Sequence, residues 1–148
     1  MKRRGFLAVA LVMIPSRGNT QGANAHVSTT DPLVVAITKG KDVHPGRVKL
    51  ALPAVAVSGH SVAMTVKVDS PMSAADHVRA VHLISEKNPV REMATFYLGP
   101  HSGRAEVSSR IRLNGTQRMT AIAELSDGSF WSDQVAIEVR ETACTDGG

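Results

Sequence analysis

The sequence contains almost no cysteine: Cys144, close to the C-terminal end, is the only one among 148 residues. A single thiol cannot form an internal disulfide, so packing alone must stabilise the fold. Cys144 also follows the last predicted strand and stands among small residues, ahead of Gly147 and Gly148. It is therefore not a core residue, and is either incidental or a chemical handle.

Long hydrophobic runs are also absent. The most apolar stretch, residues 6–14, would form a helix of roughly 14 Å, whereas a bilayer core is about 30 Å thick. It follows Lys2-Arg3-Arg4 and precedes Ala23-Asn24-Ala25, the order of a cleavable export signal over residues 1–25, which makes His26 the predicted mature N-terminus. The run Arg3-Arg4-Gly5-Phe6-Leu7 resembles the twin-arginine signal, so we predict export to a bacterial periplasm, with an ordinary secretory signal as the alternative.

The predicted mature chain has no formal net charge of either sign. The full sequence has a formal net charge of +4. Residues 1–25 hold Lys2, Arg3, Arg4 and Arg17 and no acidic residue, so the remainder is formally neutral. A neutral domain has no net field that would gather phosphates. We therefore expect neither a nucleic acid nor a membrane among its partners.

Motifs of catalysis and cofactor binding are absent as well. There is no Walker or dinucleotide-binding glycine pattern and no G-x-S-x-G elbow. The histidines lack metal-ligand spacing, and no His or Met follows Cys144 to complete a copper site, so the methionines are interpreted as core residues. We expect no catalytic residue, no metal and no cofactor, and hence a protein that is not an enzyme.

What the chain does contain is a series of short segments rich in β-branched residues, separated by turn residues at regular intervals. The predicted strands cover residues 33–38, 47–52, 61–68, 78–84, 91–98, 104–113, 117–125 and 130–140. Segments of this length and spacing, without helical periodicity, are typical of an all-β sandwich. We predict about seven or eight strands within residues 32–140, a polar linker over 26–31 and a flexible tail over 141–148.

Alternation within the segments supports this assignment. In residues 62–68 the even positions are apolar and the odd positions small or polar, as a half-buried strand requires. Asn114-Gly115 and Asp127-Gly128 are hairpin signals, because both dipeptides supply the positive φ of tight turns. Val135, Ile137 and Val139 share one face of the last strand, which makes Arg140 the predicted end of ordered structure.

Aromatic side chains make up 3% of the chain, and four of them form two adjacent pairs, Phe96-Tyr97 and Phe130-Trp131. In a strand, one ring of each pair must point away from the core. This pattern predicts a second covered surface, and with it a protein partner. Arg110 and Arg112 also share one strand face, which is either solvated or used in docking.

Several motifs together resemble the SoxY family, the sulfur-carrier subunits of the bacterial thiosulfate-oxidising (Sox) system, over essentially the whole predicted mature chain. The matching residues are Ser70-Pro71-Met72, Glu86-Lys87-Asn88-Pro89, Ala94-Thr95-Phe96-Tyr97-Leu98, residues 107–113, Gln117 and Ser126-Asp127-Gly128. The resemblance implies an immunoglobulin-like β-sandwich. It also implies a heterodimer with a SoxZ-like companion subunit, and a cysteine that carries sulfur intermediates as covalent adducts.

The tail departs from the family pattern, which is Gly-Gly-Cys-Gly-Gly. Here Cys144 follows Thr142-Ala143 and precedes Thr145-Asp146. Threonines restrict a backbone that glycines would leave free. Glu141, Asp146 and the terminal carboxylate place negative charge near the thiol, which should raise its pKa.

Two hypotheses of function therefore stay open. In the first, the protein is a periplasmic covalent sulfur carrier in thiosulfate oxidation. Cys144 is then the attachment point, Gly147 and Gly148 give the arm flexibility, and a Sox cytochrome, hydrolase and dehydrogenase act on it in turn. In the second, the chain is a SoxY-like interaction module that has lost the Gly-Gly-Cys-Gly-Gly arm and no longer carries sulfur.

Overall fold

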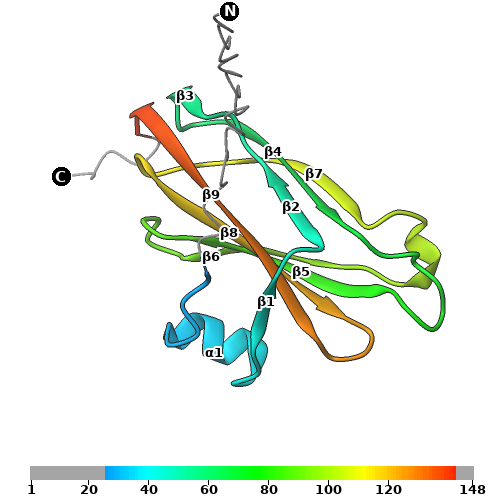
Figure 1. Cartoon of the computed structure of the whole chain (residues 1–148). Helices are drawn as coiled ribbons and strands as arrows, with labels where there is room; N and C mark the ends of the chain where they lie inside the picture. Colours follow the sequence, from blue (N-terminus) through cyan, green and yellow to red (C-terminus); the bar gives the residue numbers. More distant parts are fainter. Residues whose placement is uncertain (1–25, 143–148) are drawn as a thin grey trace, which may run out of the picture.

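The computed structural model describes residues 26–142, which form a β-sandwich with one short helix (Figure 1). In chain order the elements are α1 (Pro32–Thr38), β1 (Val43–Pro45), β2 (Val48–Ala51), β3 (Val55–Ser58), β4 (Val62–Val68), β5 (Val78–Ser85), β6 (Glu92–Tyr97), the 3-10 turn η1 (Pro100–Ser102), β7 (Glu106–Ile111), β8 (Gln117–Leu125) and β9 (Phe130–Glu141). The all-β, immunoglobulin-like sandwich expected from the sequence is confirmed.

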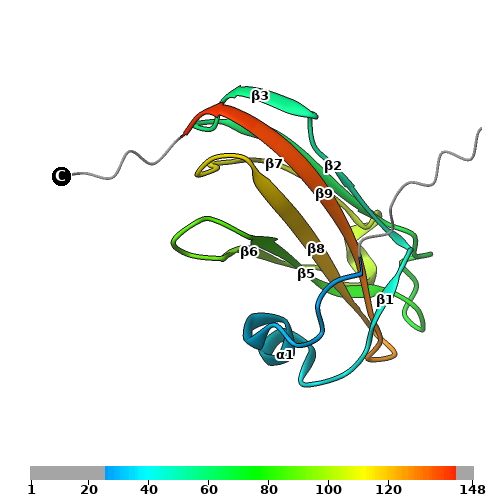
Figure 2. The same ribbon diagram turned by 60° about the vertical axis from the view of Figure 1, so that its left-hand side comes forward.

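Two sheets make up the sandwich. The larger has the order β1-β9-β8-β5-β6, with β3 also paired to β9, and the smaller has the order β2-β4-β7. Figure 2 shows the smaller sheet above the larger one and α1 below it. The larger sheet is therefore the middle layer, and both of its faces are covered over part of their area.

The main core lies between the two sheets. On β4, buried and exposed residues alternate along the strand, so Val62, Met64, Val66 and Val68 face the larger sheet. The central strands β5 and β8 supply Leu83 and Met119, neither of which is exposed at all. Full burial of side chains this large contributes about 1.5–3 kcal/mol each, which makes this core the main source of stability.

The first predicted strand, 33–38, is wrong: these residues lie in helix α1. The Asp31 carboxylate accepts a hydrogen bond from the Leu33 amide at 3.0 Å, and Pro32 occupies the first helical turn. Lys39, at φ 56°, ends the helix with a left-handed residue. An N-cap aspartate followed by proline favours a helix start, and here it outweighs the β-branched composition of the segment.

Helix α1 is stabilised by packing on a second, smaller core on the other face of the larger sheet. Val34 of the helix packs there with Ile84, Ile122 and Phe130. Val27 belongs to the same cluster and is 8% exposed. Residues 26–31, which we expected to be a linker, therefore contribute to the packed body.

The aromatic pairs predicted a surface covered by a protein partner, and this prediction is corrected at the Phe130-Trp131 pair. Phe130 is 2% exposed because it lies in the smaller core, while Trp131 packs against the main core from the opposite face. The second surface under this pair is thus covered by the chain's own helix rather than by a partner. At the other pair, Phe96 packs against the main core and Tyr97 is 82% exposed.

The remaining strands were predicted to within a few residues, except β1 and β3, which were missed. Both are very short, and both pair in parallel with β9: Val43 lies opposite Phe130, and Ala56 opposite Val139. Segments of three or four residues carry too little periodicity to be recognised from sequence.

We predict that Leu83→Ala destabilises the mature chain by about 2–5 kcal/mol, because it removes a fully buried side chain from the main core and leaves a cavity. Urea unfolding followed by circular dichroism measures the change. The control is Val57→Ala on β3, where the side chain is 69% exposed and the expected change is within about 0.5 kcal/mol. Equal effects of the two substitutions would contradict the assignment of the main core.

Candidate functional site

The C-terminal end of β9 is held on both sides. On one side, Ser58 of β3 lies opposite Glu141, and the Gly59 amide donates to the Glu141 carbonyl at 2.7 Å. On the other side, the Thr116 hydroxyl accepts from the Val139 amide at 3.0 Å. The strand is therefore fixed to its last residue, and the predicted end of order at Arg140 differs from the end of β9 by one residue.

A polar network lies beside this end of the strand. The buried side chains of Ser85 and Gln117 are joined by a short hydrogen bond, donated by the Ser85 hydroxyl to the Gln117 carbonyl oxygen. The Gln117 amide group donates to Asn88 Oδ1 at 3.1 Å, and the Asn88 amide group donates to the Arg112 carbonyl at 2.8 Å. The Asn114 amide also donates to Asn88 Oδ1, at 2.9 Å. The network fastens the β5–β6 turn to the turn between β7 and β8.

The two turns meet the chain as it leaves β9. Gly115, at φ +89°, lies so close that a Cβ built on it would be 3.5 Å from the Thr142 methyl group and 3.9 Å from Lys87 Nζ. A side chain here would also be strained by the positive φ. Figures 1 and 2 both show the end of β9, the β5–β6 turn and the β7–β8 turn at one end of the molecule. We call Lys87, Gly115, Glu141 and Thr142 the tail root.

The site residues predicted from the sequence, Cys144, Gly147 and Gly148, lie outside the described residues. The structure places only the tail root, two residues before Cys144.

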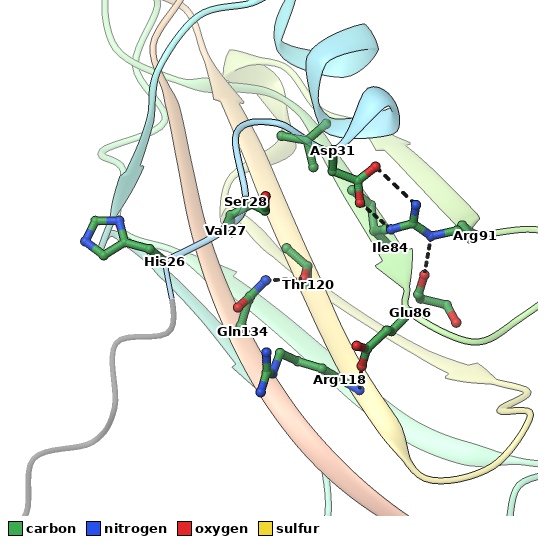
Figure 3. Close-up of a pocket in the computed structure, with 12 residues that line it drawn as sticks. His26, Val27, Ser28, Asp31, Ile84, Glu86, Arg91, Arg118, Thr120 and Gln134 are labelled. Atoms are coloured by element: carbon green, nitrogen blue, oxygen red, sulfur yellow. Dashed lines mark hydrogen bonds and ion pairs between the residues drawn. The ribbon is translucent and has the colours of Figure 1, made fainter.

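A pocket of about 180 Å³ lies on the helix-covered face of the larger sheet (Figure 3). Its walls come from the N-terminal segment, from β5 and the turn after it, and from β8 and β9. They include Asp31, Arg91, Glu86, Arg118, Thr120 and Gln134. The Gln134 amide group donates to Thr120 Oγ1 at 2.9 Å, while its own carbonyl oxygen is buried and has no partner among the described residues. Polar and apolar groups line the pocket about equally, and its charged groups are of both signs.

An ion pair closes one side of this pocket. Arg91 donates two hydrogen bonds to the Asp31 carboxylate, at 3.1 and 2.5 Å, and a third to the Ser85 carbonyl at 3.2 Å. The bonds from Arg91 hold the pKa of Asp31 below its ordinary value of 3.8. The pair joins the N-terminal segment to the same turn that carries Asn88 and Lys87.

Among residues 26–142, no three His, Cys, Asp or Glu side chains lie close enough together to hold a metal ion. None of the helices there has the length and apolar character needed to cross a bilayer. The absence of a metal from the protein stays a prediction.

Comparison with protein families gives a match between residues 34–144 and the family of the sulfur oxidation protein SoxY. The chain belongs to the SoxY family. The matched region runs from helix α1 past the tail root and includes Cys144. The resemblance read from the sequence motifs is therefore confirmed for the family. Comparison with the curated proteins gave no match.

Solved structures share the fold. The SoxY sulfur carrier protein from Chlorobium limicola f thiosulfatophilum is 19% identical, with a TM-score of 0.63 over 76% of this chain and 92% of that one. Superoxide reductase (neelaredoxin) from Ignicoccus hospitalis is 16% identical, with a TM-score of 0.58 over 66% and 94%. Superoxide reductase from Nanoarchaeum equitans is 13% identical, with a TM-score of 0.55 over 65% and 100%. At such identities the likeness shows a common fold and says nothing of activity.

Sequence reasoning missed the residues around the SoxY tail root and the pocket. Lys87 and Asn88 were noticed only as part of a family motif, and no pattern indicated that Asp31 pairs with Arg91. The pair is 60 residues apart in sequence, and only the fold brings it together. The Asp31-Pro32 dipeptide, a helix start signal, was the one local clue available.

We predict that Asp31→Asn lowers the stability of the chain at pH 7 by about 1 kcal/mol or less, because the ion pair with Arg91 is partly exposed. The lowered pKa means that the carboxylate stabilises the fold above pH 3.8, and that this contribution is lost as the pH falls below it. Between pH 6 and pH 2 the variant should therefore lose less stability than the parent chain in urea unfolding. Asparagine keeps the helix cap through its one carbonyl oxygen, while its amide group loses both the charge and the hydrogen bond that Oδ2 accepts from Arg91. Parallel pH curves would contradict the prediction.

Proposed function

We propose that this SoxY-family protein is a periplasmic covalent sulfur carrier in thiosulfate oxidation, with Cys144 as the attachment point. One observation carries the proposal: the family match extends through residue 144 and so includes the only thiol of the chain. The position of the tail root supports it, because β9 is held to Glu141 at one end of the sandwich, three residues before the cysteine in the sequence.

The chemistry needs a thiolate and an external oxidant. The Cys144 thiolate and the terminal sulfur of thiosulfate each lose one electron to a c-type cytochrome, forming Cys–S–S–SO₃⁻. Water then cleaves the bond to the sulfonate, releasing hydrogen sulfate and leaving Cys–S–SH. A dehydrogenase would then pass six electrons from the outer sulfur to a cytochrome acceptor, with three waters supplying the oxygens of Cys–S–SO₃⁻. A second hydrolysis would release hydrogen sulfate and restore the thiol. Bond formation at thiolate sulfur and its later release are within the ordinary reactivity of a cysteine.

A tethered substrate suits a sequence of enzymes. A mobile arm replaces free diffusion with a high effective concentration at each active site. Because Glu141 belongs to β9, the arm in this proposal is residues 142–148, one residue shorter than expected from the sequence. Residues 142–144, extended, would reach roughly 10 Å beyond Glu141, which is enough to enter a cleft, and Gly147 and Gly148 give clearance at the tip. The chain itself is not an enzyme.

The proposal includes export and a partner. The twin-arginine-like signal over residues 1–25 would deliver the folded chain to the periplasm. A SoxZ-like companion subunit would bind the sandwich. Strand β6 lies at the edge of the larger sheet, and the exposure of Val90 (71%) before its start and of Tyr97 (82%) at its end supports a contact along this edge.

A second candidate function is a SoxY-like interaction module that no longer carries sulfur. It is favoured by the tail sequence, in which Thr142-Ala143 and Thr145-Asp146 replace the glycines of the family arm. The alternative keeps the partner interface and drops the covalent chemistry.

We predict that Cys144→Ser abolishes thiosulfate-dependent growth, because serine cannot form a bond to sulfur under these conditions. Growth of a strain carrying the variant in place of the native gene measures the loss. In parallel, intact mass spectrometry of the native protein from thiosulfate-grown cells should show Cys144 with added sulfur or thiosulfonate. The matched control is Ser109→Ala on an exposed face of β7, which should grow normally. Undiminished growth of the cysteine variant, with only a bare thiol in the native protein, would favour the interaction module.

A further inference from the structure

Strand β6 has one edge without a neighbouring strand. It ends the order β1-β9-β8-β5-β6, and no other strand of residues 26–142 pairs with it. The Leu98 amide donates to the Arg79 carbonyl of β5 at 2.9 Å. Peptide groups alternate in direction along an antiparallel strand, so Thr95 and Tyr97 direct theirs away from β5. Their N–H and C=O groups are therefore placed to pair with a further strand.

The core-facing side of β6 is only partly covered. Ala94 and Phe96 lie opposite Leu83 and Val81 of β5, and all four face the main core. Leu83 and Val81 are 0% and 1% exposed, whereas Ala94 and Phe96 are half-buried. The smaller sheet has three strands and covers β5 fully but β6 in part. A further strand beside β6 would complete the burial of these two side chains.

The other side of β6 borders a groove of about 340 Å³. Leu33 and Ile37 of helix α1 line one wall of it, and Tyr97 of β6 lines the other. Figure 2 shows β6 on the side of the larger sheet where α1 lies. Tyr97 is 82% exposed beside this groove. An exposed aromatic ring next to an apolar wall is typical of a contact surface.

The edge lacks the features that usually protect edge strands. Lysine, proline and inward-pointing charges block unwanted pairing in many sheets. Strand β6 has no lysine, arginine or proline, and its one charged residue, Glu92, lies at its start. The bulge in β6 is also at its start, where the register shifts between Leu83 and Ile84 of the partner strand. The stretch from Ala94 to Leu98 is therefore a regular, uncharged edge.

This stretch is complementary to itself. Two copies related by a two-fold axis at Phe96 would place the two Phe96 rings side by side, with Thr95 opposite Tyr97 on either side of the axis. The outward peptide groups belong to Thr95 and Tyr97, so each such pair could exchange both of its N–H···O bonds. Ala94 would lie opposite Leu98. No charged side chain lies in the stretch, so no like charges oppose each other across the strands.

We propose that two copies of this chain pair in antiparallel fashion along β6, around a two-fold axis at Phe96, and form one continuous sheet across a homodimer. The same surface is used by both copies, so the assembly closes at two. The inference goes beyond the proposed function, because it concerns the chain without its companion subunit. A companion that binds along this edge would replace the second copy.

The test is sedimentation equilibrium of the mature chain from micromolar to millimolar concentration, with a reductant present so that Cys144 forms no disulfide. We expect a monomer–dimer equilibrium. Tyr97→Pro removes an outward N–H group and the exposed ring, while an edge strand tolerates proline at such a position. It should raise the dissociation constant at least about tenfold, because two hydrogen bonds are lost per dimer.

The matched control lies on the free edge of the smaller sheet. The Val68 amide donates to the Ala105 carbonyl at 2.8 Å, so by the same alternation Ser108 of β7 directs its peptide groups outward. Ser108→Pro should dimerise like the parent chain. Circular dichroism confirms that both proline variants fold.

Amide hydrogen exchange of the parent chain gives a second measurement that needs no substitution. The amides of Thr95 and Tyr97 should become protected as the concentration rises, while the outward amides of β7 should not change. A monomer at every concentration, a dimer that Tyr97→Pro leaves intact, or protection at β7 instead of β6 overturns the inference. None of these results bears on sulfur carriage, which the growth of the Cys144→Ser strain tests separately.

Discussion

The structure depends on the pairing of β9 along both of its edges. β8 runs beside it for most of its length, while β1 and β3 pair in parallel with its two ends on the opposite edge. The strand also ties the two sheets together, because the Asp133 carboxylate of β9 accepts a hydrogen bond from the Leu50 amide of β2 at 2.9 Å. The chain therefore leaves the body from its most constrained strand, and everything inferred about the tail starts from that fixed point.

A second constraint is the polar network formed by the buried side chains of Ser85 and Gln117 and the half-buried side chain of Asn88. Its members come from β5, the turn after it and the start of β8, so it links strands of the middle layer to the turn that contacts the tail. Buried polar groups of this kind are costly unless fully bonded, and each of these three makes several bonds. Such a network specifies one geometry for the turn after β5.

Much of the fold could be predicted from the sequence because the strands differ clearly from the turns between them. Strand β4 and the last part of β9 alternate between buried and exposed residues, whereas β8 is buried on both faces and is marked by the hairpin dipeptides on either side of it. Helix α1 could not be predicted from the same rule, since its residues are as β-branched as a strand and the deciding signals are a cap and a proline. β1 and β3 were too short to show a period, and they form because β9 offers them a free edge.

The candidate site, like the fold, could be predicted from the sequence only in part. A lone cysteine near the C-terminus is visible in the sequence, and the family motifs gave it a context. The surroundings of the tail root were not visible, because Lys87, Gly115 and Thr142 are far apart in the chain and meet only through the turns that Asn88 and Gln117 hold. Hydrogen-bond networks between the side chains of different turns produce no periodic pattern in the sequence, whereas the buried face of a strand does.

The pairing of β9 on both edges determines how the protein resists a pulling force. A pull on the chain beyond Thr142, directed along the strand, would load the ladders to β8 and β3 in shear, so that many hydrogen bonds resist together and none can be peeled off singly. If an enzyme bound the terminal residues and then moved away, β9 would stay paired and the sandwich would stay folded.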